Sequence, residues 1–352
     1  MNEAETNPLA DARCVLVRVP NWVGDVVMAT PLFDRLRAGL PDARLVACAR
    51  PYVTRILANG PWFDEVLAVD DKGRGGLRRT VRAIRAQRPD AAVLLPNSWR
   101  ALLAVRLAGV RRIYGYRRRG RQLLLTGGPR PERDADGTVV PQPMTTYYLG
   151  LARALGLPVA ADSRPSLYVG EAVARRGDEL LQRYGIGPDD EMIGINPGAK
   201  FGSSKCWPTA HFARLAELLT SANPGRRLLL FVGPGEEELA EAIVAESEAP
   251  LINTGPDRVD LELLKPLVRR CRVLVTNDTG PRHYAVALGV PAVVIMGPTD
   301  PRYTAANLDH TTVLRRELPC SPCHLKTCPN AHECMTGITP AAVAAAVEDR
   351  LQ

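Results

Sequence analysis

The sequence of 352 residues has few aromatic side chains and no long hydrophobic run. Aromatic residues make up only 5% of it, too few to be interleaved with basic runs as stacking platforms for nucleic-acid bases. No apolar run approaches the roughly 18 residues that span a bilayer, and residues 1–5 lack the basic and apolar regions of a secretory leader. These absences predict a cytoplasmic protein with no transmembrane segment and no nucleic-acid partner.

Two common nucleotide-binding signatures are also missing. After the first strand-like run, at 15–19, the chain reads Pro20-Asn21-Trp22-Val23-Gly24 instead of Gly-x-Gly-x-x-Gly. A nicotinamide-dependent oxidoreductase is therefore disfavoured. The loop that begins at Asn196 contains glycines and lysines, but not the glycine pair followed directly by Lys-Ser/Thr that defines a P-loop.

Positive charge is abundant and unevenly placed. The net charge is +7 with a pI near 9.1, which favours an anionic partner. Because the scarcity of aromatic residues disfavours a nucleic acid, the remaining partners of this kind are an anionic membrane surface and a phosphorylated substrate. Residues 111–133 contain eight arginines against one acid, Glu132, and residues 72–88 form a second basic run. These runs indicate either a solvated face or a patch that binds an anionic substrate or faces a membrane.

Strand-like and helix-like segments alternate from end to end. The expected strands are 15–19, 44–49, 66–69, 91–95, 192–196, 228–232, 251–253, 272–276 and 292–296, and helices include 77–87, 100–108, 211–219, 236–246 and 340–351. This alternation predicts an α/β protein with two Rossmann-like domains, whose parallel sheets face a central cleft. The pattern breaks at 127–131 and 158–165. We therefore expect domains at 1–170 and 171–352, with the last helix packing on either one.

Three loops of the second half carry polar residues at strand ends. Asp278 ends a strand and is followed by a helix, whose first N–H groups and dipole attract an anion. The alternative for Asp278 or Thr279 is a helix cap alone. Because ligands of such sheets bind at the carboxyl ends of the strands, the loops predict one phosphate site. Its candidate residues are Gly198, Ser203, Ser204, Lys205, Glu236, Asp278, Thr279, Gly280 and His283.

In the first half, Asn21, Trp22, Gly24 and Asp25 follow the first strand. Gly24 is expected to allow a tight turn close to a substrate. A carboxylate at Asp25, at the start of a helix, can accept a proton from an attacking hydroxyl. Its alternative is again a helix cap.

Together these motifs resemble the glycosyltransferase family 9 heptosyltransferases over nearly the whole chain. The resemblance is carried by Trp22-Val23-Gly24-Asp25, Leu95-Pro96-Asn97-Ser98, Asn196-Pro197-Gly198-Ala199, Lys205-x-Trp207-Pro208 and Asn277-Asp278-Thr279-Gly280-x-x-His283. Asp-Thr-Gly-x-x-His is fairly specific for the family, whereas Gly-Asp is specific only when the other motifs accompany it. Within the family, the Pro-Asn-Ser and Pro-Gly-Ala-x-Phe-Gly pieces are most similar to the branch that adds the second heptose.

The resemblance implies a GT-B fold, with an N-terminal acceptor domain and a C-terminal domain that binds ADP-heptose. The implied reaction is an inverting transfer of L-glycero-D-manno-heptose to the heptosyl-Kdo2-lipid A inner core of lipopolysaccharide. Heptosyltransferases I, II and III share the motifs, so the resemblance leaves open which heptose of the core is added. Another nucleotide-sugar donor also remains an alternative.

The same resemblance implies roles for the candidate residues. Asp25 is the implied general base, and Lys205 pairs with the diphosphate, helped by Ser203 or Ser204. Asp278, Thr279, Gly280 and His283 hold the phosphates and nearby sugar, and Glu236 binds the ribose. The acceptor, and peripherally the membrane face, would contact Asn21, Trp22, Gly24, Arg117, Arg118 and Arg119.

No catalytic metal or other cofactor is expected. Asp-x-Asp, the usual metal motif of nucleotide-sugar enzymes, occurs only at Asp134-Ala135-Asp136, in a Pro- and Gly-rich loop with no strand before it. A separate cluster consists of Cys320, Cys323, Cys328 and Cys334. It indicates a structural zinc, reduced free thiols or a redox-labile loop, with an iron-sulfur cluster as a further alternative.

Overall fold

The computed structural model describes residues 7–352, so the segment 1–5 discussed above lies outside the described residues. Internal contacts divide the chain into two compact units: Met1–Tyr168 with Arg302–Ala306, and Val169–Pro301 with Asn307–Gln352. Over the described range, no helix is both long and apolar enough to cross a membrane.

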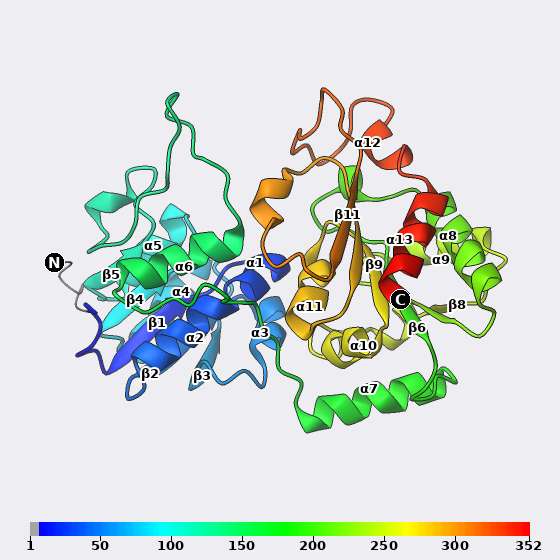
Figure 1. Cartoon of the computed structure of the whole chain (residues 1–352). Coiled ribbons are helices and arrows are strands. Elements are labelled where there is room, and N and C mark those ends of the chain that lie inside the picture. Colours follow the sequence, from blue (N-terminus) through cyan, green and yellow to red (C-terminus); the bar gives the residue numbers. More distant parts are fainter. Residues whose placement is uncertain (1–6) are drawn as a thin grey trace. The chain divides into compact units, whose positions relative to one another are not determined.

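The first unit is built around a parallel sheet of five strands in the order β3-β2-β1-β4-β5 (Figure 1). Its strands are β1 (Cys14–Arg18), β2 (Arg44–Ala49), β3 (Glu65–Ala68), β4 (Ala91–Leu94) and β5 (Arg112–Gly115). Its helices are α1 (Val23–Met28), α2 (Thr30–Gly39), α3 (Pro51–Leu57), α4 (Gly76–Ala86), α5 (Trp99–Leu107) and α6 (Met144–Ala154). The short 3₁₀ turn η1 (Arg121–Leu123) follows β5.

The second unit contains a parallel sheet of six strands in the order β11-β10-β9-β6-β7-β8. The strands are β6 (Met192–Asn196), β7 (Arg227–Leu230), β8 (Leu251–Asn253), β9 (Val273–Asn277), β10 (Ala292–Met296) and β11 (Thr311–Arg315). The helices are α7 (Glu171–Arg183), α8 (Thr209–Ala222), α9 (Glu237–Glu246), α10 (Leu264–Arg270), α11 (Gly280–Leu288), α12 (Glu333–Thr336) and α13 (Pro340–Leu351). The 3₁₀ turns η2 (Ser203–Lys205) and η3 (Gly255–Asp257) also belong to this unit. The 3₁₀ turn η4 (Pro301–Thr304) has its first residue in this unit and its other residues in the first unit.

Both sheets confirm the expected α/β class. Their central strands read as nearly continuous apolar runs because helices cover both faces of a parallel sheet. β1, β4, β9 and β10 are buried along their whole length.

The last helix, α13, packs against α8, β9 and β10 of the second unit. A buried guanidinium fixes it there, since Arg226 forms ion pairs with Glu348 of α13 and with Glu191. Of the two alternatives left open by the sequence, the structure therefore shows packing within the second unit.

The order of strands determines which loops are neighbours. In each sheet the chain reverses its direction of travel beside the first strand, between β1 and β4 in the first unit and between β6 and β9 in the second. Crevices for ligands form at such switch points, at the carboxyl ends of the strands. The motifs at 20–25, 95–98, 196–208 and 277–283 follow β1, β4, β6 and β9 respectively. All four therefore lie at switch points.

All nine expected strands agree with the structure to within two residues at each end, but β5 and β11 were not predicted. β5 lies within the arginine-rich run at 111–133. Its short sequence, Arg-Ile-Tyr-Gly, contains a charge and a glycine, so it does not form a recognisable apolar run. β11 is an edge strand with only its first residue fully buried, so its hydrophobic pattern is weak.

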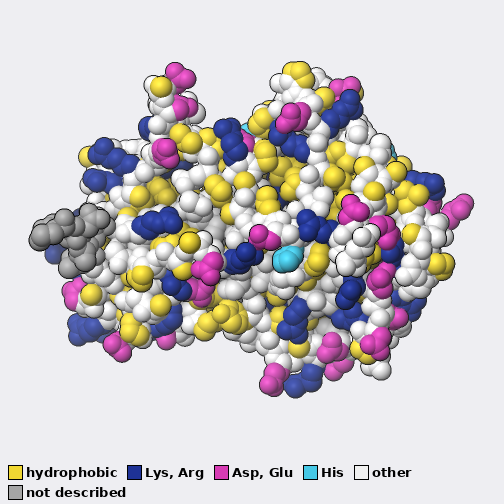
Figure 2. Space-filling view, viewed as in Figure 1, with side chains coloured by type: hydrophobic (Ala, Val, Ile, Leu, Met, Phe, Trp, Pro, Cys, Tyr) yellow, Lys and Arg dark blue, Asp and Glu magenta, His cyan; other side chains and the backbone are white. Residues whose placement is uncertain are grey.

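Basic side chains do not form one continuous patch on the visible surface. In Figure 2, Lys and Arg side chains are interspersed with Asp and Glu on the face shown. An anion site therefore depends on local groupings of basic residues.

Candidate functional site

The turn from β9 into α11 is centred on a buried carboxylate, Asp278. It accepts hydrogen bonds from Lys205 Nζ at 2.9 Å, from Arg282 Nη1 at 2.7 Å and from the Thr299 hydroxyl. Lys205 Nζ also donates to the Asp278 carbonyl at 2.8 Å. Residues from three loops are thus brought to one point. Of these partners, Thr299 was not predicted as a site residue.

The ionisation of Asp278 follows from this environment. Burial by itself would raise the pKa of Asp278, but the positive charges of Arg282 and Lys205 outweigh burial and hold that pKa well below its ordinary value. The carboxylate is therefore charged at neutral pH. In the structure this carboxylate holds two cations in place, Lys205 and Arg282.

His283, one turn into α11, is neutral. Burial, followed by the positive charge of Arg282, lowers the pKa of the His283 imidazole to about 3. At neutral pH the ring can donate one hydrogen bond and accept another, but it cannot supply a cation. Thr279 and Gly280, at the N-terminus of α11, are partly exposed, and the Thr279 hydroxyl makes no capping hydrogen bond. The N–H groups of this turn are therefore not capped by that side chain.

The loop that carries Lys205 is tied to the sheet by its neighbours. Asn277, the last residue of β9, donates from its amide to the Pro197 carbonyl and accepts from the Trp207 backbone N–H at 3.2 Å. The Trp207 ring is 1% exposed and donates to the Ile338 carbonyl at 2.9 Å. The Lys-x-Trp-Pro motif therefore combines a lysine that pairs with Asp278 and a tryptophan that anchors the loop in the core.

The two predicted serines differ in their surroundings. Ser203 is exposed at the start of η2. Ser204 is buried, and its hydroxyl donates to the Leu325 carbonyl while its N–H donates to the Lys326 carbonyl at 3.0 Å. The ring of His332 is 2.7 Å from the Ser204 carbonyl and, as its Nε2–H tautomer, donates to it. Residues 320–334, the cysteine-rich segment, thus form hydrogen bonds with the hydroxyl, N–H and carbonyl groups of Ser204. The hydroxyl proton of Ser204 is therefore not available to a diphosphate.

Glu236 lies where the loops after β6 and β7 meet. Its carboxylate accepts from the Gly233 N–H at 2.9 Å, and a Cβ added to Gly198 would stand 2.0 Å from its Cδ. Gly198 therefore leaves room for the close approach of this side chain. Burial raises the pKa of Glu236, in opposition to the Gly233 hydrogen bond.

In the first unit, the β1–α1 connection places Asp25 in the first turn of α1. Trp22, at the N-cap position, is 55% exposed, and Asn21 accepts from the buried Arg18 guanidinium at 3.4 Å. The tight turn expected at Gly24 is absent, because α1 already begins at Val23 and Gly24 has ordinary helical backbone. A glycine here keeps the first helical turn free of a side chain.

Asp25 receives a hydrogen bond that the sequence did not reveal. The hydroxyl of Tyr148, on α6, donates to Asp25 Oδ1 at 3.1 Å. The two residues are 123 positions apart in the chain, so no local pattern announces the contact.

The three predicted arginines follow β5. Arg117 and Arg119 are exposed and Arg118 is half-buried. Next to them, Arg121 is completely buried and donates to the Asn97 side chain at 3.1 Å. The arginine run is therefore divided between solvent and core.

The cysteine cluster does not have the arrangement of a zinc site. All four of its thiols are free, and they range from exposed at Cys320 to buried at Cys334. Residues 7–352 contain no group of three or more His, Cys, Asp or Glu side chains arranged to hold a metal ion. The structural zinc offered by the sequence is therefore not supported.

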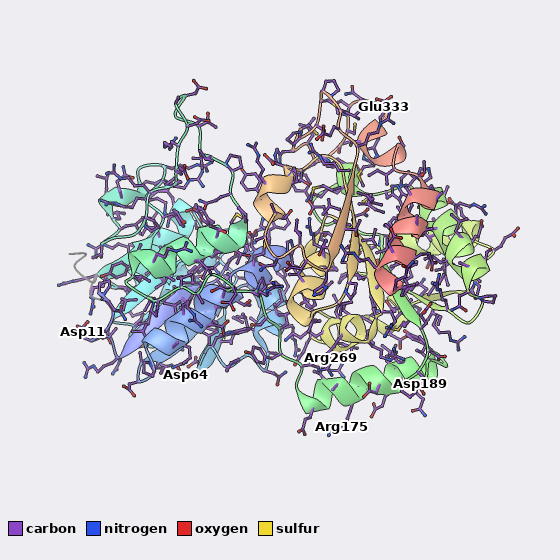
Figure 3. The ribbon with its side chains drawn as sticks, in the orientation of Figure 1. Asp11, Asp64, Arg175, Asp189, Arg269 and Glu333 are labelled. Carbon is purple, nitrogen blue, oxygen red and sulfur yellow. The ribbon has the colours of Figure 1, made fainter. Side chains whose placement is uncertain are left out.

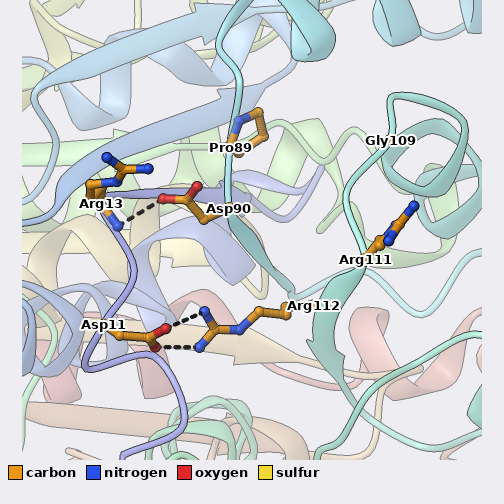
Figure 4. Close-up of a pocket in the computed structure, with 7 residues that line it drawn as sticks. All are labelled: Asp11, Arg13, Pro89, Asp90, Gly109, Arg111 and Arg112. Carbon is orange, nitrogen blue, oxygen red and sulfur yellow. Dashed lines mark hydrogen bonds and ion pairs between the residues drawn. The ribbon is translucent and has the colours of Figure 1, made fainter.

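Two further features do not belong to the site. Asp134 accepts hydrogen bonds from the Asp136 and Thr138 N–H groups, so this acidic triplet forms a turn. The pocket in Figure 4, lined by Arg13, Asp90 and Arg111 among others, lies where β1, β4 and β5 begin, at the opposite end of the sheet from the motifs.

Comparison with known proteins places this arrangement in a family. The family described as glycosyltransferase family 9 (heptosyltransferase) matches residues 77–333. Lipopolysaccharide heptosyltransferase 2 of Salmonella typhimurium is 31% identical over 313 residues, covering 86% of this chain and 87% of that protein. The corresponding Escherichia coli protein is 30% identical, with the same coverage of both chains.

A solved structure agrees with these matches. The structure of E. coli ADP-heptose LPS heptosyltransferase II aligns with a TM-score of 0.77 and 29% identity, over 96% of this chain and 98% of that one. Sequence, fold and the residues gathered at the switch points together show that the chain belongs to glycosyltransferase family 9, the heptosyltransferases.

Proposed function

We propose that the protein is an inverting glycosyltransferase that transfers L-glycero-D-manno-heptose from ADP-heptose to the heptosyl-Kdo2-lipid A inner core of lipopolysaccharide. The names of its relatives support this reaction and step. The observation that carries the proposal is the Lys205–Asp278 ion pair at the switch point of the second sheet. A lysine held there is suited to a nucleotide diphosphate.

Lys205 and the N-terminus of α11 would stabilise the departing ADP. Charge develops on the diphosphate as the bond to the sugar breaks, and a fixed ammonium with fixed N–H groups neutralises it without reorganisation. Ser203, exposed beside Lys205, would add a hydroxyl donor, and neutral His283 a hydrogen bond. Glu236, at the neighbouring strand end, would accept from a ribose hydroxyl.

Asp25 would act as general base. It would take the proton of the acceptor hydroxyl as that oxygen attacks the anomeric carbon, and the attack from the face opposite ADP gives inversion. Exposed Arg117 and Arg119 suit the carboxylates and phosphates of a Kdo-lipid A core. With the basic run at 72–79, they would also support peripheral contact with the inner face of the cytoplasmic membrane.

The test is ADP release from ADP-heptose, measured with EDTA present and with two acceptors. Release only with heptosyl-Kdo2-lipid A supports the second transfer step, without a catalytic metal. Release with Kdo2-lipid A would assign the protein to the first step of the pathway. If neither acceptor supports release, the proposed donor and acceptor are wrong.

The base is tested by Asp25→Asn. We expect kcat to fall by about 10²- to 10⁴-fold, the usual contribution of a general base, with ADP affinity unchanged. Asp42→Asn, an exposed aspartate of the same unit, is the control for the substitution. Full activity of Asp25→Asn would exclude the base role while leaving the donor assignment intact.

A further inference from the structure

The contact between Tyr148 and Asp25 has a defined polarity. Tyr148 is only 4% exposed, and burial, followed by the negative charge of Asp25, raises the pKa of its phenol well above the ordinary value. The phenol therefore stays protonated over the pH range of enzyme assays. It can only donate to the carboxylate, and the acceptor atom is Oδ1.

The backbone that carries Tyr148 is held from the neighbouring residue. The ring of Tyr147 stacks on Tyr116 with centroids 3.7 Å apart and planes 8° from parallel. The Tyr116 hydroxyl donates to the Tyr147 carbonyl. A Cβ added to Gly150 would meet this hydroxyl at 2.4 Å, so glycine permits the close approach of α6. The segment after β5 is thereby locked to α6.

A second anchor comes from the Pro-Asn-Ser motif after β4. The Asn97 amide donates to the Tyr147 hydroxyl at 2.7 Å, and its carbonyl accepts from Arg121 at 3.1 Å. Both ends of the Asn97 side chain are used, which fixes its orientation. This explains a motif that has no direct part in the proposed chemistry. The chain of contacts runs from Arg121 through Asn97 and Tyr147 to the helix that presents Tyr148.

We infer that Tyr148 is a positioning residue for the reaction: its hydroxyl fixes the orientation of the Asp25 carboxylate toward the acceptor hydroxyl. A carboxylate on a short helix can rotate about its terminal torsion, which is broad. A donor from a rigid helix selects one orientation of that torsion. The inference rests on the proposed role of Asp25 as the base, and it assigns Tyr148 no contact with substrate.

The perturbation is Tyr148→Phe, which removes one oxygen and keeps the ring that packs edge-on against Tyr147 at 5.7 Å. We expect kcat to fall by about 10- to 100-fold, the usual cost of a misplaced reacting group. The KM for ADP-heptose should be unchanged, because the donor residues lie in the second unit. The melting temperature and ADP affinity verify that the variant is folded.

Tyr184→Phe is the matched control. It also removes a tyrosine hydroxyl that donates to an aspartate, Asp257, but between α7 and η3 of the second unit. Its kcat should equal that of the wild type. Tyr116→Phe, which loosens the anchor of α6 without touching Asp25, should lower kcat by a smaller factor than Tyr148→Phe.

The decisive measurement is a double-mutant cycle. If Tyr148 acts only through the carboxylate, adding Tyr148→Phe to Asp25→Asn should change kcat by less than about twofold, because residues that act as a unit are not additive. The same holds for Tyr116→Phe in that background. A further 10-fold loss of kcat when Tyr148→Phe is added to Asp25→Asn would overturn the inference. A Tyr148→Phe enzyme with wild-type kcat would overturn it too.

Failure of the inference can be distinguished from failure of the proposed function. If Asp25→Asn shows the expected loss of kcat and Tyr148→Phe behaves like Tyr184→Phe, the base assignment stands and the positioning role is wrong. If Asp25→Asn keeps full activity, the base assignment itself is wrong, and the inference falls with it.

Discussion

Replacing Asp278 by asparagine should strongly destabilise the second unit. The carboxylate is 7% exposed and pairs with Lys205 and with Arg282, whose side chains are 13% and 1% exposed. Removing one partner of a buried ion pair costs about 3 to 5 kcal/mol, because the remaining charge is left buried and uncompensated. Lys205 keeps some access to water, and asparagine retains one acceptor oxygen. We therefore expect a loss of about 3 kcal/mol in the free energy of unfolding at pH 7.

Differential scanning calorimetry measures this loss. For a unit of this size, 1 kcal/mol corresponds to about 2 to 4 °C, so the melting temperature should fall by about 6 to 12 °C. Added ADP identifies the transition of the second unit, because a ligand raises the melting temperature of the part that binds it. The control is Asp189→Asn, at an exposed site labelled in Figure 3, which should change stability by less than about 0.5 kcal/mol.

The stabilisation by Asp278 should also depend on pH, in a direction that follows from its pKa. The pKa of Asp278 in the folded state is below the value of about 4 expected in the unfolded chain. Its stabilisation is therefore complete above that unfolded-state pKa and is lost as pH falls below it toward the folded-state pKa. The difference between wild type and Asp278→Asn should shrink below about pH 4. A loss under about 1 kcal/mol at pH 7, or one of equal size at pH 3, would refute the reasoning.

Three other outcomes follow from the described geometry. Lys205→Ala should weaken ADP binding by about 10- to 100-fold in calorimetric titration, the value of a charge-assisted hydrogen bond, and unchanged affinity would exclude the diphosphate contact. Burial, followed by the charge of Arg282, lowers the pKa of His283 to about 3. His283→Gln should therefore leave the shape of the pH profile of kcat unchanged between pH 5 and 8. Loss of an ionisation from the profile in that range would contradict a neutral imidazole. Burial raises the pKa of Cys206, so mass spectrometry after iodoacetamide treatment at neutral pH should show slower alkylation there than at exposed Cys320, and preferential labelling of Cys206 would argue against a deactivated thiol.

The behaviour expected of Cys206 from the structure differs from what its neighbour in the sequence suggests. A thiol next to Lys205 is expected to be reactive if the ammonium lowers its pKa. In the structure the ammonium is directed to Asp278 instead. Burial and the carboxylate of Glu236 raise the pKa of the thiol. Adjacency to Lys205 along the chain therefore suggests the wrong direction for the pKa shift of Cys206.

Candidate residues were predictable where the signal is local. A strand followed by Asn-Asp-Thr-Gly and a helix can be recognised from ten residues, and the same holds for Trp-Val-Gly-Asp after β1. Contacts between distant segments could not be found this way. Lys205 and Asp278 are 73 positions apart, and Ser204 is bonded to Leu325, 121 positions later. No periodicity links such pairs.

The sequence by itself determined the alternation of strands and helices, the α/β class and the polar residues at the ends of the strands. These follow from hydrophobic period and turn chemistry, which act over a few residues. The tertiary structure decided the order of the strands, and with it which strand ends are neighbours. It also decided that Asp278 faces two cations, that Ser204 is covered by the cysteine-rich segment and that Tyr148 meets Asp25. The physical reason is that burial and charge pairing depend on the packing of segments far apart in the chain.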